Sequence, residues 1–405
     1  MAHRCCSYRR MAIDLIDIVL ESESKPGLAP ADAPIKIRML DNETDWQAAA
    51  GLIEAVCEDA HAPVFVFPHW LHSAWCWRVP GARLKVVLAT VKDECVGFAP
   101  LVTSARTAIG FQIRILQLVA VPDTQFVDLV ARPALAYEFA AALSSHLHDA
   151  RSDWDRLELA NLSDRFGNWR LFAQALAGAG IAAVVIPAGA NPFVDLRGSF
   201  ADYYAARSRR LKKSINLGAN RLAQMGRIEI EWVRNCSAAD EALTEAIRVS
   251  SISWKKSTDT TLNQGGPRAF IERLTAGAAG RGQLSLWLLR LNGRVIATEY
   301  QLIHEGVVHA LRADFDPAFG YASPGSYLNR HLLEQLFSAG LRRYCMGAGS
   351  NAYKRRWADG SEPMFQLLAY SPTWRGKLLH WCERSLLPLL RRSRPALGQA
   401  SKKAF

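Results

Sequence analysis

Alternating apolar and polar positions divide the chain after residue 34 into short strands and helices. The segment IKIRML, residues 35–40, predicts a strand, and residues 42–60 predict a helix with a polar, capped start. Two strands follow, RLKVVLATV and ECVGFAPLVTSA, joined by a turn at Lys92 and Asp93. The strand FQIRILQLVAV, a helix over residues 133–148 and the strand DRLELANL complete a first unit of roughly 150 residues.

The second half of the chain repeats this order of elements. Helices are predicted over residues 199–225, 237–255 and 266–279. The strands QLSLWLLRL, VIATEYQLIH and VVHALRADF then form an antiparallel meander with the turns NGR and EG. A helix over residues 323–339, the strand RRYCMG, a short helical turn and the strand MFQLLAYS follow. We therefore expect an α/β (α+β) fold with two copies of one plan, although two unrelated α/β domains would give the same order.

Changes in composition set the expected domain boundaries. Residues 1–34 end in SKPGLAPADAP, which is typical of a flexible leader. We expect a first domain over residues 35–190, a second over residues 191–373 and a basic amphipathic tail over residues 374–405. Tryptophans and leucines alternate with basic residues in the tail, so it could lie on an anionic membrane or dock against the body of the protein.

Composition limits the kinds of binding partner and the cellular compartment that we expect for this protein. The net charge of +11 favours a polyanionic partner, which could be nucleic acid, an acidic membrane surface or a cofactor. The eight cysteines are scattered, without a C-x-x-C pair or histidines at zinc spacing, so we expect no metal site and a reducing cytoplasm. The apolar segment MAIDLIDIVL is interrupted by Asp14 and Asp17, and no charge-free run of eighteen residues predicts a membrane span.

The segment MGAGSNAYKRRW, residues 346–357, combines glycines with basic residues. A phosphate-binding Walker loop needs glycine directly before lysine and serine or threonine directly after it, whereas Tyr353 and Arg355 flank Lys354 here. The segment instead predicts a turn with Ser350 or Asn351 capping one helical turn. The chain also lacks a G-x-S-x-G nucleophile motif and a recognisable cysteine and histidine pair, which disfavours a hydrolase.

The segment YASPGSYLNRHLL contains the best-specified helix start. Ser323 is expected at the N-cap and Pro324 at the first helical position. Free N–H groups around Gly325, Ser326 and Tyr327 would favour an anion such as a pyrophosphate. A well-capped helix without a ligand gives the same pattern.

The same residues carry a family resemblance. The stretch SWKK followed by GQLSLWLLRL through SPGS to YKRRW is similar to the C-terminal half of the CelD/BcsL-type acetyltransferases. These belong to the GNAT superfamily and are related to the FemAB-type transferases. Upstream, FPHWLHSAW, FAPLV and TQFVDLV resemble the N-terminal half of the same family, so the resemblance covers most of residues 35–371. It implies tandem GNAT-like units, each a mixed, mostly antiparallel sheet flanked by helices.

The resemblance also implies a cofactor site. In that superfamily acyl-CoA enters a split between two strands, and its pyrophosphate lies on the following helix start. Carried over, the phosphates fall on Ser323, Gly325 and Ser326, with Lys354 and Trp254 completing the expected cofactor-binding set. The chain has YASPGS where many members have a glycine-rich Q/R-x-x-G-x-G/A loop, and YCMG where related chains often have an aspartate.

Direct acyl transfer from a thioester to an amine needs a base for the amine and an acid for the thiolate, but no covalent intermediate. The candidate bases are Glu299, Asp314 and Asp316, which lie on or after the second and third strands of the meander. Tyr327 and Tyr353 are candidate acids. A strand-face carboxylate or a turn aspartate with no catalytic role would look the same in the sequence.

The predicted function is an N-acyltransferase of the GNAT type that uses acetyl-CoA or another acyl-CoA, without a metal. The acceptor would be an amine-bearing small molecule or sugar, and the resemblance places the reaction in polysaccharide or cell-envelope biosynthesis. One alternative is a FemAB-like aminoacyl transferase with tRNA as its nucleic-acid partner. Another is a non-catalytic binding or assembly protein of an exopolysaccharide pathway. We expect a cytoplasmic protein, with peripheral contact to the inner face of the membrane as an option for the tail.

Overall fold

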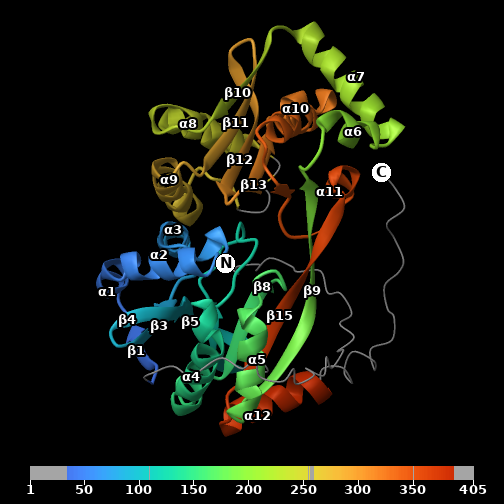
Figure 1. Ribbon diagram of the computed structural model, residues 1–405. Coiled ribbons are helices and arrows are strands. Elements are labelled where there is room, and N and C mark those ends of the chain that lie inside the picture. The colour runs from blue at the N-terminus through green and yellow to red at the C-terminus, as the bar shows by residue number, and fades with distance from the viewer. Residues whose placement is uncertain (1–33, 109, 254, 256–259, 350, 387–405) are drawn as a thin grey trace.

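The computed structural model describes residues 34–386, except residues 109, 254, 256–259 and 350. The expected leader up to residue 33, the end of the tail from residue 387, and the predicted site residue Trp254 lie outside the described residues. The molecule has two lobes, the C-terminal half above the N-terminal half in Figure 1. The long strands β9 and β15 run side by side through both lobes.

The first half of the chain ends with the long strand β9. Its elements are β1 (Lys36–Leu40), α1 (Glu43–Ala48), α2 (Ala50–Asp59), η1 (Val64–Val66), α3 (Pro68–Cys76), β2 (Arg83–Leu84), β3 (Val86–Val91), β4 (Glu94–Ala99), β5 (Leu101–Ala108), β6 (Phe111–Leu118), β7 (Val130–Ala131), η2 (Pro133–Leu135), α4 (Ala136–Asp149), β8 (Arg156–Leu162), α5 (Asn168–Gly178) and β9 (Ala182–Asp195).

The second half begins with two helices and ends with a helix that packs on the first half. Its elements are α6 (Phe200–Ala205), α7 (Arg209–Met225), β10 (Ile228–Val233), α8 (Cys236–Ile252), α9 (Gly265–Gly280), β11 (Leu284–Leu291), β12 (Arg294–His304), β13 (Val307–Phe315), η4 (Pro317–Ala322), α10 (Pro324–Ser338), β14 (Arg343–Cys345), α11 (Ala352–Trp357), β15 (Gly360–Tyr370), α12 (Trp374–Trp381) and the π-helical turn η5 (Cys382–Leu386).

The described strands form one sheet of 11 strands and one of four. The large sheet has the order β10-β11-β12-β13-β14-β9-β15-β8-β6-β5-β2, and the small one β1-β3-β4-β7. Most neighbours are antiparallel; the parallel pairs among the described strands are β13–β14 and β6–β8. The predicted α/β class, with mostly antiparallel sheets flanked by helices, is confirmed.

The last strand of each half lies in the sheet of the other half. β15 pairs with β8 on one side and β9 on the other, and β9 pairs with β14. The expected domain boundary at residue 190 therefore falls inside β9. Each half depends on a strand of the other half to cover an open sheet edge.

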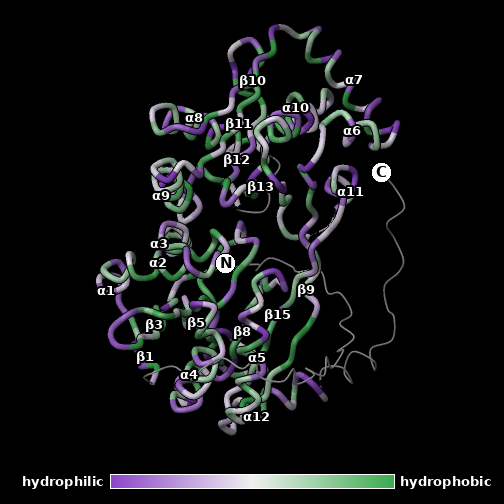
Figure 2. The backbone as a smooth tube through the Cα atoms, in the orientation of Figure 1, coloured by the Kyte–Doolittle hydropathy of each residue, from purple (hydrophilic) through white to green (hydrophobic). Residues whose placement is uncertain are grey.

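Two hydrophobic cores cover the faces of the large sheet. The first extends from the lower lobe into the upper one and buries residues such as Phe98, Trp169 and Phe270. The second lies under α7, α10 and α11 and buries Leu332 and Trp357. Figure 2 shows hydrophobic residues concentrated on the strands, and mostly hydrophilic residues along α7.

Several predicted elements are divided in the structure. The segment ECVGFAPLVTSA forms β4 in the small sheet and β5 in the large one, separated by Pro100, which has no N–H to donate to a strand ladder. The helix predicted over residues 42–60 is α1 and α2, and its expected cap is confirmed because Asn42 Oδ1 accepts a hydrogen bond from the Asp45 amide (2.9 Å). The helix predicted over residues 199–225 is α6 and α7, and Ser208 caps α7.

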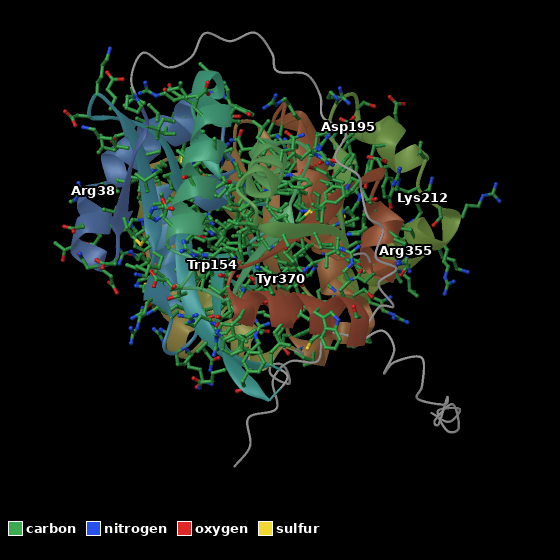
Figure 3. All side chains as sticks on the ribbon, turned by 90° about the horizontal axis from the view of Figure 1, so that it is seen from below. Arg38, Trp154, Asp195, Lys212, Arg355 and Tyr370 are labelled. Atoms are coloured by element: carbon green, nitrogen blue, oxygen red, sulfur yellow. The ribbon has the colours of Figure 1, made fainter. Side chains whose placement is uncertain are left out.

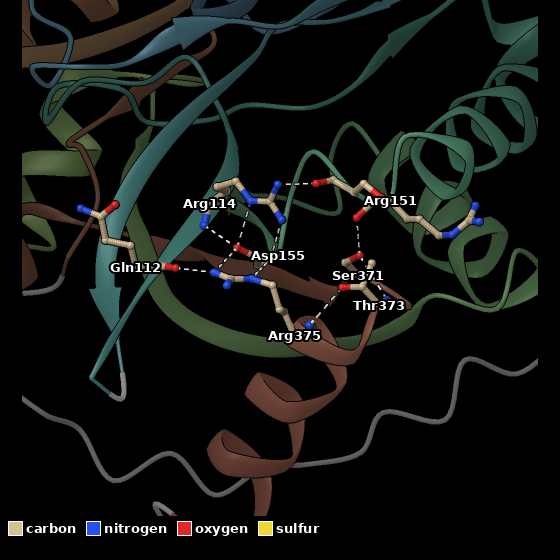
Figure 4. Close-up of polar contacts among 9 residues, drawn as sticks. Gln112, Arg114, Arg151, Asp155, Ser371, Thr373 and Arg375 are labelled. Carbon is tan, nitrogen blue, oxygen red and sulfur yellow. Dashed lines mark hydrogen bonds and ion pairs between the residues drawn. The ribbon is translucent and has the colours of Figure 1, made fainter.

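The C-terminal helix α12 is held on the lower lobe by a buried carboxylate (Figure 4). Asp155 is fully buried and accepts hydrogen bonds from the side chains of Arg114 (2.8 Å) and Arg375 (3.0 Å). Leu379, on the inner face of the helix, packs in a small core with Ile113. Part of the predicted tail therefore docks against the body of the protein.

Replacement of Asp155 tests this attachment. Burial alone would raise the pKa of Asp155, but hydrogen bonds from Arg114 and Arg375 outweigh it and lower the pKa to about 2. Its stabilising contribution is therefore present above the usual carboxyl pKa and is lost as pH falls through about 2. We expect Asp155→Asn to lower the free energy of unfolding at pH 7 by about 3 kcal/mol, measured by urea denaturation. The exposed neighbour Asp153→Asn is the control; equal losses in both variants would contradict the assignment.

Candidate active site

A split in the large sheet creates the candidate site. β13 and β14 pair only from Val307 and Arg343 to His309 and Cys345, and β13 then continues to Phe315 without β14. After Cys345 the chain stays with β9, because the Met346 amide donates to the Pro192 carbonyl (2.9 Å). The pairing of β12 with β13 is irregular between Tyr300 and Gln301, beside the point of divergence. β13 and β14 therefore diverge beyond His309 and Cys345.

A cavity of about 570 Å³ fills this opening. Its walls come from β12, β13, the start of α10, the end of β14, α11 and a loop of the N-terminal half, residues 122–125. Both halves of the chain thus contribute side chains to one site.

The centre of the cavity wall holds a buried acid paired with neutral groups. Glu299 Oε1 accepts hydrogen bonds from the Tyr344 hydroxyl (2.5 Å) and from the Gln301 amide (2.8 Å). Burial raises the pKa of Glu299, and these hydrogen bonds only partly oppose it. Burial and the adjacent Glu299 raise the pKa of Tyr344 well above its ordinary value, so Tyr344 is the proton donor of the pair. Both of these hydrogen bonds are to Oε1, and Glu299 lines the cavity.

The glycine-rich segment after β14 leads into α11 and lines the cavity with a tyrosine and a lysine. Asn351 caps α11 by accepting from the Lys354 amide (2.9 Å), as predicted. The Lys354 ammonium donates to the carbonyls of Gly347 (2.7 Å) and Ala348 (3.0 Å), and burial lowers its pKa to about 8. Burial raises the pKa of Tyr353, which is therefore a neutral hydroxyl at physiological pH.

The start of α10 differs in detail from the prediction. Pro324 opens the helix as expected, but Ser323 adopts a left-handed conformation (φ 51°) and its side chain makes no capping hydrogen bond. Its carbonyl instead accepts from the amides of Ser326 (3.0 Å) and Tyr327 (3.1 Å). Gly325 has space at its Cβ position, where the nearest described atom is Phe315 Cδ1 at 3.7 Å. Ser323, Gly325 and Ser326 of this helix start line the cavity, and the Ser323 side chain does not cap the helix.

The wall facing the N-terminal half carries two ion pairs. Asp314 pairs with Lys255 (3.1 Å), and Arg312 donates from Nε to Asp123 of the N-terminal loop (2.6 Å). Arg312 and Asp314 are buried, and Asp123 is partly buried. The second pair links the two halves across the cavity.

The structure brings most predicted site residues together. The following residues line the cavity: Glu299, Asp314, Ser323, Gly325, Ser326, Tyr353 and Lys354. Asp316 and Tyr327 are not among the described lining residues. Asp316 caps η4 by accepting from the Ala318 amide (3.0 Å) and pairs with Arg294, and the Tyr327 ring packs against His331.

Tyr344, Gln125 and Asp123 were not predicted from the sequence. Tyr344 lies in YCMG, and its relation to Glu299 depends on two strands that are not neighbours in the sheet. Gln125 and Asp123 lie in a loop nearly two hundred residues from β13 in the sequence. The segment TQFVDLV contributed to the family resemblance, but it did not indicate which of its side chains would contact the C-terminal half of the chain.

Within the described part of the chain, no cluster of three or more His, Cys, Asp or Glu side chains could hold a metal ion. None of the described helices is long and apolar enough to span a membrane.

The raised pKa of Glu299 predicts a pH-dependent cost to stability. A carboxyl whose pKa is higher in the folded protein stabilises it below the unfolded pKa of about 4.3, and this contribution is lost as pH rises through the folded pKa. Wild type should therefore lose stability relative to Glu299→Gln as pH rises from 4.5 to 8, measured by urea denaturation. Thr298→Ser, on the same strand, should show a pH-independent difference. A constant gap for Glu299→Gln would mean that the carboxyl is not desolvated.

One protein family matches the part of the chain that contributes most of the residues lining the cavity. Residues 207–355 match the acetyltransferase (GNAT) domain family. No curated protein matches the chain significantly. The finer CelD/BcsL assignment stays a prediction.

Three of the solved structures that are similar to this chain have the following identities, coverages and TM-scores. FemX is 11% identical, with 86% of this chain and 100% of FemX covered and a TM-score of 0.52. The C-terminal domain of a putative lysylphosphatidylglycerol synthetase from Agrobacterium fabrum is 15% identical, with 83% and 94% covered and a TM-score of 0.49. A tandem GNAT protein from the clavulanic acid biosynthesis pathway is 12% identical, with 84% and 99% covered and a TM-score of 0.43. At 11% identity the likeness to FemX concerns the fold alone. Residues 207–355, which match the GNAT domain family, include most of the residues that line the cavity, and this match supports an acyltransferase.

Proposed function

We propose that the protein is an acyl-CoA-dependent N-acyltransferase that transfers an acyl group directly from the thioester to an amine. The observation that carries this proposal is the cavity at the divergence of β13 and β14, with a helix start at one side and the buried Glu299 in its wall. The polysaccharide or cell-envelope setting rests on the sequence resemblance alone.

The start of α10 is the proposed site of the donor's phosphates. The first turn of a helix presents N–H groups without helical partners, and the helix dipole favours an anion there. Gly325 and Ser326 lie in this turn and line the cavity. Because the Ser326 amide donates to the Ser323 carbonyl and Pro324 has no N–H, the Gly325 amide is the group proposed to bind the anion. The absence of a side chain at Gly325 lets an anion approach the backbone. From here the acyl arm would extend along the split towards Glu299.

Glu299 is the proposed base and Tyr353 the proposed acid. Oε2 of Glu299 accepts the proton that the attacking amine loses as its nitrogen bonds to the thioester carbonyl carbon. The carbon–sulfur bond then breaks, and the departing thiolate takes a proton from the Tyr353 hydroxyl. Tyr344 and Gln301 hold the carboxylate in place. Asp314 is held by Lys255 and is proposed to orient the acceptor.

One observation favours a second donor, an aminoacyl-tRNA. Helix α7 presents Arg209, Arg210 and Lys213 to solvent and packs against η4, next to the start of α10. The contact is close, because a Cβ on Gly218 would lie 2.5 Å from the Ala322 carbonyl oxygen. A basic helix beside the phosphate site would suit a polyanion larger than CoA.

We also propose that α12 contacts an anionic membrane surface. While Leu379 faces inward, Trp374 (71% exposed), Leu378 (40%) and Trp381 (57%) share the outer face with Lys377. Figure 3, seen from below, shows α12 on the outer side of the molecule. Tryptophan and leucine beside cations suit the interface of a negatively charged bilayer. Residues 387–405, which follow this helix, contain five basic and no acidic residues in the sequence.

Titration of the protein with acetyl-CoA tests the donor. We expect binding by calorimetry, and we expect Gly325→Glu to weaken it by at least about a hundredfold, because a carboxylate would face the phosphates. Gly51→Glu, in an open position on α2, is the matched control and should bind as wild type does.

Two outcomes would contradict the donor assignment. Unchanged affinity in Gly325→Glu would remove the phosphates from the start of α10. Failure of wild type to bind any CoA species, with salt-dependent binding of aminoacyl-tRNA, would favour the second donor.

Vesicle sedimentation tests the membrane contact. The protein should bind phosphatidylcholine vesicles that contain phosphatidylglycerol, and bind pure phosphatidylcholine less. Trp374→Ser with Trp381→Ser should weaken binding by at least about tenfold, since both rings leave the interface. Tyr137→Ser, another exposed aromatic (50%), is the control. Undiminished vesicle binding by the double variant would show that this face does not serve the membrane.

A further inference from the structure

A side chain from the N-terminal half occupies the sheet split beside the cavity. Gln125 Nε2 donates a hydrogen bond to the Ala310 carbonyl of β13 at 2.7 Å. Ala310 is the first residue of β13 beyond the ladder with β14, which ends at His309 and Cys345. In a continuous parallel ladder a carbonyl in this position would accept from a main-chain amide of β14. Here a side-chain amide takes that place.

The position of Gly347 supports this substitution. A Cβ on Gly347 would lie 3.5 Å from the Ala310 carbonyl oxygen and 3.6 Å from Gln125 Nε2. The chain that continues from β14 is therefore adjacent to Ala310, and Gln125 stands next to both. On the other side, Lys354 holds the carbonyls of Gly347 and Ala348. Side chains thus hold both arms of the split where strand pairing has stopped.

Gln125 is presented by a well-fixed loop. It is 2% exposed, and its Oε1 accepts from Asn191 Nδ2 of β9 (3.2 Å). The preceding residue Thr124 closes a turn by accepting from the Val121 amide (2.9 Å). Asp123 is tied to Arg312 of β13. The amide therefore cannot withdraw from the split without breaking several buried polar contacts.

We propose that Gln125 is a positioning residue that keeps β13 and β14 apart, so that the N-terminal half controls access of the donor to the C-terminal half. The link to the donor rests on the proposed function, whereas the effect on the strands does not. Without this amide, the Ala310 carbonyl becomes free to accept from the β14 side, and the split narrows.

Hydrogen exchange followed by mass spectrometry tests the proposal in the full-length protein without donor. In Gln125→Met, which keeps the length but not the donor group, the amides of residues 346–349 should exchange at least threefold more slowly. Gln125→Asn, one methylene too short to reach Ala310, should show the same change if the methionine variant fails to fold. Gln117→Met makes the same chemical change on β6, outside the cavity, and should leave this segment unaltered.

Acetyl-CoA titration of the same variants distinguishes a failure of the Gln125 proposal from a failure of the proposed function. Both Gln125 variants should bind acetyl-CoA at least tenfold more weakly than wild type. Faster or unchanged exchange in residues 346–349 would overturn the proposal, because Gln125 would then be an ordinary packing residue. Slower exchange in the variants together with no acetyl-CoA binding by wild type would uphold the effect on the strands and refute the donor instead.

Discussion

The pairing of β9 with β15 is the constraint on which the rest of the structure depends. Their antiparallel register runs from Gly360 and Phe193 to Tyr370 and Ala182, and it joins the sheets of both halves into one. Each strand completes the half to which it does not belong in sequence, so neither half has a finished sheet alone. The loop at residues 122–125 reaches β13 because this pairing fixes the two lobes against each other. The cavity is therefore a property of the whole chain, although the domain match lies within the second half.

The same pairing explains why the sheet opens where it does. β14 contributes three residues to the ladder and has neighbours on both sides, β13 and β9. Beyond Cys345 the chain keeps its hydrogen bonds to β9, through Met346 and Gly349, and leaves β13. The carbonyls and amides freed on the open side need partners, since buried polar groups without them are costly. Gln125 and Lys354 supply such partners and leave room for a ligand.

Local patterns predicted many of the elements but missed α3, α5, β9 and β10, and they did not predict which strands pair over long distances in the sequence. The meander, the helix start at Pro324 and the Asn351 cap follow from residues close in sequence, and all three are present. β9 was not predicted as a strand, because Pro187, Gly189 and Pro192 interrupt its apolar pattern, and the exchange of β9 and β15 leaves no local signal. For the same reason the sequence suggested Glu299 but not Tyr344, which meets it across the sheet. Ser323 was expected to cap the helix with its side chain. Its backbone is left-handed instead, and its carbonyl accepts hydrogen bonds from the amides of Ser326 and Tyr327.

The environments of the cavity's carboxylates assign them different roles. Asp123 and Asp314 each have a basic partner, Arg312 and Lys255, so their charges are compensated at short range. The close partners of Glu299 are the neutral Tyr344 and Gln301, and burial raises its pKa. A paired carboxylate gives up its salt bridge when it accepts a proton, whereas protonation of Glu299 breaks no ion pair. Glu299 is therefore the carboxylate that can accept a proton from an incoming amine while both ion pairs stay intact, and the ion pairs are better suited to fixing the shape and polarity of the wall that faces the acceptor.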